Sequence, residues 1–284
     1  MSTQQTHAEI SDFDRALREA RADDAHVPTR TPLLLPAASL WWREVVRFYR
    51  QRSRWVGVVL SPVLFWAVIG SGLGDSFRAG GGEGQAGYLE YFFPGTLVLT
   101  LLFTSIFCMM SVIEDRREGF LLSVLVSPAP RASIVLGKVA GGTTLAVAQG
   151  TLFLLLAPLA GLRLSLSNVV AALGAMFLVS FGLTALGFCV AWRLDSTHGF
   201  HALVNLLLVP MWLLSGALFP ASGASLWVSW VMRLNPLTYG VALVRHALGV
   251  GAATGWPVAL GVVAASCAGV FLLALVVVNR RGRA

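Results

Sequence analysis

Charged residues are scarce in this chain: they make up 12% of its 284 residues, whereas hydrophobic residues make up 56%. A soluble domain carries roughly 25% charged residues, and the mean hydropathy here is +0.73. Together with repeated apolar runs of bilayer-spanning length, this composition indicates a single domain of a polytopic membrane protein.

Six apolar runs are long enough to cross a bilayer, which predicts an all-α fold with six transmembrane helices. The runs are residues 55–73, 93–113, 139–162, 169–192, 202–219 and 257–278. The polar segment before them, residues 1–38, is predicted to be a disordered cytoplasmic tail. Residues 39–284 then form the predicted transmembrane domain.

Cysteines and metal-ligand clusters are rare. Cys108, Cys189 and Cys267 all fall inside apolar runs, so we expect small core residues and no disulfide framework. His198 and His201 have the spacing of a metal-binding pair but no third ligand nearby, which predicts an ordinary loop and no metal site. Residues 1–32 contain no apolar run typical of a cleavable signal peptide.

The phosphate-binding motif GxxxxGK[ST] is missing, because Gly137 and Lys138 are followed by Val139. None of the six runs contains Asp, Glu, Lys, Arg or His, the intramembrane groups on which ion-coupled transporters and proton pumps depend. We therefore expect a transport subunit that is not an enzyme and holds no ATP, Mg²⁺ or other cofactor. Such a transporter would take its energy from a partner.

The formal net charge of +7 comes largely from basic residues that flank the apolar runs, so nucleic acid is not an expected partner. One side of the membrane receives Arg43, Arg47, Arg50, Arg52, Arg54, Arg116, Arg117, Arg131, Lys138, Arg193, Arg280, Arg281 and Arg283, and the other receives Arg78, Arg163, Arg233 and Arg245. Because basic residues gather on the cytoplasmic side, thirteen against four places both termini in the cytoplasm of an inner (plasma) membrane protein.

Residues 39–54 have the pattern of a basic amphipathic helix. Its arginines fall on one stripe, and apolar and aromatic residues gather opposite. The stripe contains Arg43, Arg47, Arg50 and Arg54, and the opposite face contains Trp42, Val45, Val46 and Tyr49. This pattern predicts a helix resting on anionic lipid headgroups; an ordinary charged flank without a defined helix is the alternative.

The loop at residues 114–138 starts with charges and continues with the short apolar segment 120–126. Its leucines and valines recur at helical spacing, and Ser127-Pro128 ends the helix because proline disfavours helical geometry in the residue before it. We predict a short amphipathic helix that docks another protein on the same side of the membrane.

The outside segment, residues 220–255, alternates apolar and polar residues and carries Asn235-Pro236. Two short helices broken at this dipeptide are predicted, either dipping into the outer leaflet or capping the bundle as surface helices. Within the runs, the amides of Gln149 and Asn205 either line a translocation path or join helices by hydrogen bonds. Gly137 and Gly141 have the spacing that permits close helix approach.

Three groups of residues resemble the membrane permease subunits of type-2 ABC exporters, the ABC-2 class. The first group is Arg117-Glu118-Gly119, Leu121, Leu125, Ser127-Pro128 and Leu136-Gly137-Lys138; the second is Gly216-Ala217-Leu218-Phe219-Pro220; the third is Asn235-Pro236-Leu237-Thr238-Tyr239 with Arg245. The similarity runs from about residue 40 to the C-terminus and includes the six-span layout.

This resemblance implies two permease subunits, as a homodimer or a heterodimer, above two cytoplasmic ATPase subunits that bind the ATP and Mg²⁺. The implied cargo is amphipathic or lipid-like: a drug, a lipid or a lipid-linked glycan. The residues implied in coupling to the ATPase are Arg117, Glu118, Gly119, Leu121, Leu125 and Pro128. Those implied in an outer gate are Phe219, Pro220, Asn235, Pro236, Tyr239 and Arg245. No residue is catalytic on this reading.

Family members often have Thr-Leu-Glu after Arg-Glu-Gly, whereas this chain has Phe120-Leu121-Leu122. The groove of the partner is therefore expected to be more apolar. Two other functions fit the layout: a membrane enzyme acting on lipids through Arg233, Tyr239, Arg245 and His246 at the outer face, and an assembly factor. The lack of a carboxylate or nucleophile near those four residues speaks against the enzyme.

Overall fold

The computed structural model describes residues 33–50, 52–72, 87–219 and 224–280. This part of the chain contains helices and no strand. Most of the predicted tail and Pro220 lie outside the described residues.

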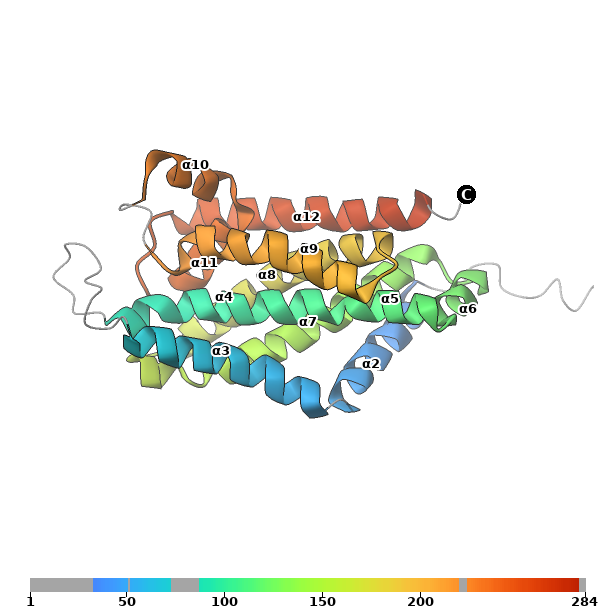
Figure 1. The fold of residues 1–284 in the computed structure, drawn as a ribbon, viewed down its shortest axis with the longest axis horizontal. Helices are drawn as coiled ribbons and strands as arrows, with labels where there is room; N and C mark the ends of the chain where they lie inside the picture. Colours follow the sequence, from blue (N-terminus) through green and yellow to red (C-terminus); the bar gives the residue numbers. More distant parts are fainter. Residues whose placement is uncertain (1–32, 51, 73–86, 220–223, 281–284) are drawn as a thin grey trace, which may run out of the picture.

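The helices follow one another along the chain with short connections. They are α2 (Leu34–Arg50), α3 (Arg52–Gly72), α4 (Tyr88–Cys108), α5 (Met110–Arg117), α6 (Phe120–Val126), α7 (Arg131–Leu154), the 3₁₀ turn η1 (Ala157–Ala160), α8 (Leu166–Arg193), α9 (Thr197–Trp212), the π-helical turn η2 (Leu213–Ala217), α10 (Leu226–Leu234), α11 (Pro236–Ala247) and α12 (Trp256–Arg280). Figure 1 shows the long helices side by side along the long axis, with α6 at one end and α10 at the other. We call these the α6 end and the α10 end.

The central helix is α4, which runs into α5 with a slight break at Met109. In its most apolar stretch 83% of the residues are buried, against 28% for α12. The outer helix α12 exposes large apolar side chains, among them Leu272, Leu273 and Val276. An exposed apolar surface of this extent on long helices is what hydrocarbon, and not water, accommodates.

Four described segments are long and apolar enough to cross a membrane: Tyr88–Arg117, Leu166–Arg193, Thr197–Ala217 and Trp256–Arg280. They correspond to the second, fourth, fifth and sixth predicted spans. Helices α3 and α7 cover most of the first and third predicted spans. Neither of them combines the length and the mean hydropathy of these four segments. The chain is a largely helical, multi-pass membrane protein.

Helix α2 packs along α7 and begins at Leu34, earlier than predicted. A Cβ on Gly137 would lie 2.7 Å from the carbonyl oxygen of Ala37, and one on Gly141 would lie 2.8 Å from Cβ of Glu44. Trp41 adds a hydrogen bond of 3.0 Å from its indole nitrogen to Thr144 Oγ1. The two glycines that the sequence analysis singled out therefore form the surface of α7 on which α2 packs.

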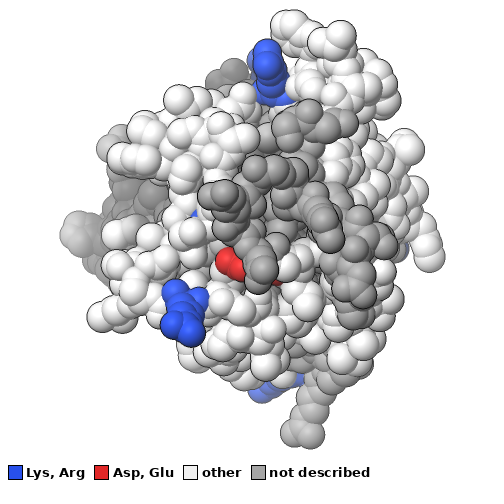
Figure 2. All heavy atoms as spheres, turned by 90° about the vertical axis from the view of Figure 1, so that its left-hand side faces the viewer, with Lys and Arg blue, Asp and Glu red and all other residues white. Residues whose placement is uncertain are grey.

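Most charged side chains of the described residues belong to elements at the α6 end. They are Arg43, Glu44, Arg47, Arg50, Glu114, Asp115, Arg116, Arg117, Glu118, Arg131, Lys138, Arg193, Asp195 and Arg280. The α10 end holds few: in the end-on view of Figure 2 most described atoms are white, with a few separate blue groups and a red one. The two ends of the bundle thus differ strongly in charge.

Candidate functional site

A sharp hinge separates α5 from α6 at the charged end. Gly119 has φ 78°, a left-handed conformation that favours glycine, and it turns the chain between the two helices. Helix α6 covers the predicted apolar segment and ends at Val126, as the Ser127-Pro128 sequence predicts. The glycine and the proline together fix a helix of two turns at the end of the bundle.

The two leucines that the resemblance implies in coupling lie on the face of α6 that packs against the bundle. Leu121 is buried and Leu125 is partly buried against the core, so these two residues attach α6 to the bundle. The exposed apolar side chains are Leu122 and Val126, which are 63% and 87% exposed. Leu122 and Val126 thus form the exposed apolar face of this short helix.

The remaining residues of the coupling group flank this face. Arg117 donates from Nη2 to the carbonyl oxygen of Asp195 at 2.7 Å, which joins α5 to the connection before α9. Glu118 is exposed and lies 3.8 Å from Arg47 Nη2. Pro128 is also exposed. Glu118 and Pro128 therefore remain accessible beside α6.

A buried ion triad joins α5, the helix that precedes the hinge, to α2 and α7. It consists of Glu44 on α2, Asp115 on α5 and Lys138 on α7. Lys138 Nζ donates to Glu44 Oε1 at 2.5 Å, to Asp115 Oδ2 and to Ser111 Oγ at 3.1 Å. The charge count assigned Lys138 to the cytoplasmic side of the membrane as a loop residue, whereas the structure buries its side chain between α2, α5 and α7.

The arginine stripe of α2 also differs from its prediction. Arg43 makes a bidentate pair with Asp115 at 2.9 and 2.7 Å, and Arg47 reaches Asp115 and Glu114, both at 2.9 Å. The hydrogen bond with Asp115 raises the pKa of Arg43. The headgroup contact predicted for these two arginines is therefore corrected: they turn toward α5 because carboxylates there are within reach.

Two other arginines of that stripe remain. Arg50 is exposed at the end of α2, whereas the side chain of Arg54 lies outside the described residues. The predicted headgroup contact stays a prediction for this pair. Trp42 and Tyr49, expected opposite the arginines, are exposed, because the buried face of α2 instead contains Ala37, Leu40, Glu44 and Phe48.

At the α10 end, α9 stops in the π-helical turn η2. Gly216 within it has φ 78°, which breaks the helix and frees backbone carbonyls. Gly95 on α4 allows close approach, since its Cβ would meet Ala217 at 2.7 Å. The indole of Trp212 donates to the Gly95 carbonyl at 2.8 Å. The broken end of α9 is thus packed against the central helix α4 and hydrogen-bonded to it.

Asn235 completes this arrangement. Its Nδ2 donates to the carbonyl oxygens of Met211 at 2.6 Å and Leu214 at 3.3 Å, while its Oδ1 accepts from the Leu237 N–H at 3.0 Å. One amide therefore caps α11 and satisfies carbonyls freed by the break. Pro236 occupies the first turn of α11, and Tyr239 donates its hydroxyl to the Arg233 carbonyl at 2.9 Å. The predicted break between two short helices is confirmed.

Arg245 is buried on α11 and donates from Nη2 to the carbonyl oxygen of Gly216 at 3.0 Å and to that of Tyr91 at 3.4 Å. Its guanidinium lies 4.0 Å from the ring centroid of Tyr91. Tyr91 in turn donates its hydroxyl to Gly216 at 3.2 Å. The structure thus brings Asn235 and Arg245 together around η2, and adds Tyr91 and Gly216, which the gate prediction did not include.

The other residues singled out by the sequence analysis have varied surroundings. Phe219 is partly buried next to the undescribed Pro220. Gln149 is buried and hydrogen-bonds Thr104 on α4, which favours the interhelical use, whereas Asn205 is exposed on α9.

His198 and His201 lie in the first turns of α9 and not in a loop, because Ser196 caps that helix with a 3.3 Å bond from Gly199 N–H.

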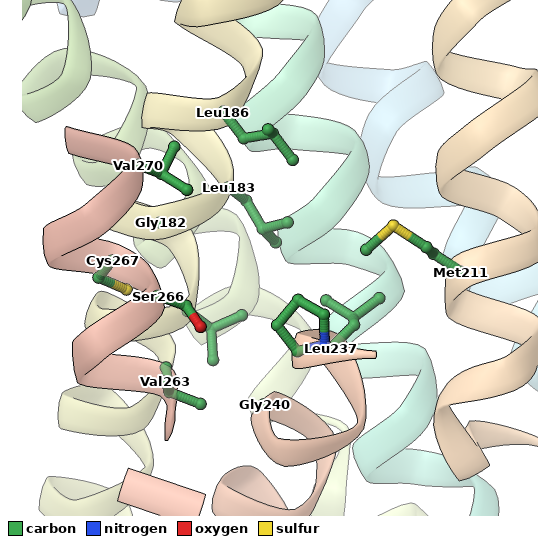
Figure 3. Close-up of a pocket in the computed structure, with 12 residues that line it drawn as sticks. Gly182, Leu183, Leu186, Met211, Leu237, Gly240, Val263, Ser266, Cys267 and Val270 are labelled. Atoms are coloured by element: carbon green, nitrogen blue, oxygen red, sulfur yellow. The ribbon is translucent and has the colours of Figure 1, made fainter. Parts of the chain in front are cut away.

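A small apolar cavity of about 80 Å³ lies between α8, α9, α11 and α12 (Figure 3). Its lining includes Gly182, Met211, Pro236, Ser266 and Cys267. All three cysteines are buried, as predicted. Among the described residues no group of three His, Cys, Asp or Glu side chains is arranged to hold a metal ion.

Sequence comparison places these two ends in a known context. The sequence model of the family described as ABC-2 type transporter matches residues 37–248, which cover α2 to α11. The chain belongs to the ABC-2 type transporter family. The match includes the hinge between α5 and α6 and the break at η2. It also includes Asn235 and Arg245, whose side chains bind backbone carbonyls at that break.

Individual relatives are more distant. The ycf38 protein of Cyanophora paradoxa, whose name describes a transport permease, is 27% identical over 206 residues, which cover 72% of this chain and 70% of the relative. Nodulation protein J of Rhizobium leguminosarum bv. trifolii is 26% identical over 220 residues, 74% of this chain and 82% of the relative. This ABC-2 protein is therefore a membrane transport permease, and its family implies an ATPase partner in general.

Proposed function

We propose that this chain is the membrane-spanning permease subunit of an ATP-driven exporter whose ATPase is a separate chain docked at α6. The observation that carries the proposal is the exposed apolar pair Leu122 and Val126 on a short helix at the charged end. Adjacent exposed apolar side chains mark a surface that a protein or a membrane covers, and we assign this pair to a protein because charged residues surround it. Glu118 and Arg117 beside them supply polar contacts at the rim of that interface.

The charge difference between the ends supports a proposal for the sidedness. Basic residues concentrate at the α6 end, and the positive-inside rule assigns that end to the cytoplasm, where an ATPase would be found. We therefore propose six spans, with α3 and α7 added to the four apolar segments, both termini in the cytoplasm and the protein in the inner (plasma) membrane.

Helices α10 and α11 would then form the outer, re-entrant element. Helix α10 exposes Trp227 and Trp230, which are 66% and 61% exposed. Tryptophan favours the membrane–water interface. The fastening of η2 by Asn235 and Arg245 would hold the outer gate of the path.

The proposed complex contains two ATPase subunits and two permease subunits, as a homodimer or a heterodimer. Helix α9 exposes the consecutive residues Asn205, Leu206 and Leu207 around much of its circumference, and this mixed surface suits either a second subunit or the cargo path. We propose an amphipathic or lipid-like cargo, a drug, a lipid or a lipid-linked glycan, because the spans are apolar. ATP and Mg²⁺ would bind the ATPase and not this chain.

The alternative of a lipid-modifying enzyme has less support. Of the residues it would use, Tyr239 and Arg245 bind backbone carbonyls, and His246 Nε2 lies 2.6 Å from the Thr254 carbonyl oxygen. These side chains fasten the backbone, and we propose no catalytic step for them.

The test is a pull-down of the tagged full-length chain from its native membrane in mild detergent. We expect a soluble Walker-motif ATPase at equal stoichiometry, and its loss in Val126→Asp. Leu226→Asp is the matched control, because Leu226 is 83% exposed on α10 at the other end. No ATPase with the native chain, or equal recovery with Val126→Asp, would contradict the proposal.

A further inference from the structure

The ion triad of Glu44, Asp115 and Lys138 joins three helices that are separate along the chain. Lys138 is 1% exposed, Asp115 is fully buried and Glu44 is 4% exposed. Both carboxylates accept from the same Lys138 ammonium group. Each of α2, α5 and α7 therefore contributes one charge to a single contact that excludes water.

Stability alone is a weak explanation of such a contact. Taking charges out of water carries a desolvation cost that their attraction offsets only in good geometry. Apolar side chains of similar size at the same positions are often as stable or more stable. In some proteins buried charges instead select one arrangement of the helices, since an unpaired charge in any other arrangement is costly.

The triad extends to α6 through one arginine. Arg43 binds Asp115 in a bidentate pair, and its guanidinium lies 3.6 Å from the centroid of the Phe120 ring at the start of α6. The stacking and the fork geometry are specific to arginine. Leu121 then anchors α6 in the core. Helix α6 cannot tilt about Gly119 without disturbing α2 and α5.

Helix α2 is in turn fixed to α7. Gly137 and Gly141, on which α2 packs, lie on either side of Lys138 in the sequence. Close packing and ion pairing therefore occur on the same stretch of α7. Helix α3 starts at Arg52, almost immediately after α2 ends at Arg50. Displacing α2 therefore displaces the start of α3.

We propose that the ion triad is a transmission joint, which makes α2, α5, α6 and α7 move as one body. A push on α6 is then delivered to α7 directly and to α3 through α2, and is not absorbed at the Gly119 hinge. Glu44, Asp115, Lys138 and Arg43 are positioning residues for transport. This inference rests on the proposed docking of an ATPase at α6.

The test variant is the pair Glu44→Met with Lys138→Met in the full chain, purified with its ATPase. This pair removes one negative and one positive charge, and leaves Asp115 bound to Arg43 and Arg47. The thermal midpoint is expected to stay the same or rise, which separates the joint from a merely structural role. Asp195→Asn is the control, because Asp195 forms an exposed ion pair with Arg116 at the same end.

Spin-label distances report the motion without knowledge of the cargo. Cysteines replace the accessible residues Ser123 on α6, Leu152 on α7 and Leu272 on α12; the native cysteines are buried. Between nucleotide-free protein and protein trapped with ATP and vanadate, the native 123–152 distance should stay constant and the 152–272 distance should shift. In the paired variant, ATP hydrolysis should persist, the 123–152 distance should change and the 152–272 shift should be lost.

If the paired variant keeps the native shift in the 152–272 distance, the transmission joint is contradicted while the proposed permease function stands. If the pair does not fold, Arg43→Lys serves instead, because it keeps the charge but loses the fork and the stacking on Phe120; a retained shift there also overturns the joint. If the native complex shows no ATPase and no ATP-dependent shift, the proposed function fails, and the joint fails with it.

Discussion

Arg245 Nη2 donates to the carbonyl oxygen of Gly216 at 3.0 Å, and this bond joins α11 to the turn where α9 breaks. The same guanidinium lies 4.0 Å from the centroid of the Tyr91 ring on α4. A single side chain thus fixes three elements at the α10 end. Gly216 makes this possible, because its left-handed backbone aims the carbonyl group away from the helix.

Replacing Arg245 by lysine should weaken this fastening. Lysine keeps the charge, but it is a point donor that cannot stack a planar fork on Tyr91. We expect a loss of about 1–3 kcal/mol for the buried donors and acceptors left unpaired, measured as a lower thermal midpoint in detergent. Arg233→Lys on the exposed α10 should change the midpoint little. An Arg245→Lys protein as stable as the native one would contradict the fastening.

Gly216→Ala should destabilise the protein, because a left-handed residue with a Cβ costs about 1–2 kcal/mol. The same substitution at Gly174 in the middle of α8 meets open space and should stabilise by up to about 1 kcal/mol, since alanine is the better helix former. The thermal midpoints of the two variants should therefore move in opposite directions. A Gly216→Ala protein as stable as the native one would exclude the left-handed turn.

Asn235 can be tested with two substitutions that divide its roles. Asn235→Asp keeps an acceptor for the Leu237 N–H but loses the donor to Met211 and Leu214, whereas Asn235→Ala loses both functions. The cap alone is worth about 1 kcal/mol, so alanine should lower the midpoint further than aspartate if the cap dominates. The reverse order would mean that the new carboxylate is repelled by the two carbonyl oxygens by more than the cap contributes. No effect from either variant would refute the arrangement, with the exposed Asn279→Asp as the control.

Much of this architecture could be predicted from local sequence. The helix at residues 120–126, its end before Ser127-Pro128 and the break at Asn235-Pro236 depend on neighbouring residues and were predicted correctly. The burial of the cysteines was predicted correctly too. Proline geometry and apolar runs act within one or two turns, and the sequence displays both directly.

The ion triad could not be predicted in this way. Charge patterns report the side of the membrane but not which carboxylate a lysine or arginine reaches, because that depends on how α2, α5 and α7 pack. One signal was present: Glu44 shares the face of α2 that holds Leu40 and Phe48. An acid on an otherwise apolar stripe requires a basic partner when it is buried.

The close contact between α8 and α12 offers the last prediction. A Cβ on Gly182 would lie 2.7 Å from Cys267 Sγ, so Gly182→Ala should strain the pair and cost about 1–3 kcal/mol. Cys267→Ala removes the sulfur and makes room for the new methyl group. The double variant should therefore be more stable than the sum of the two single effects, by a coupling of about 0.5–3 kcal/mol. Gly261→Ala on α12 meets open space and provides the control. Simple additivity in this double-mutant cycle would mean that α8 and α12 do not approach each other at these residues.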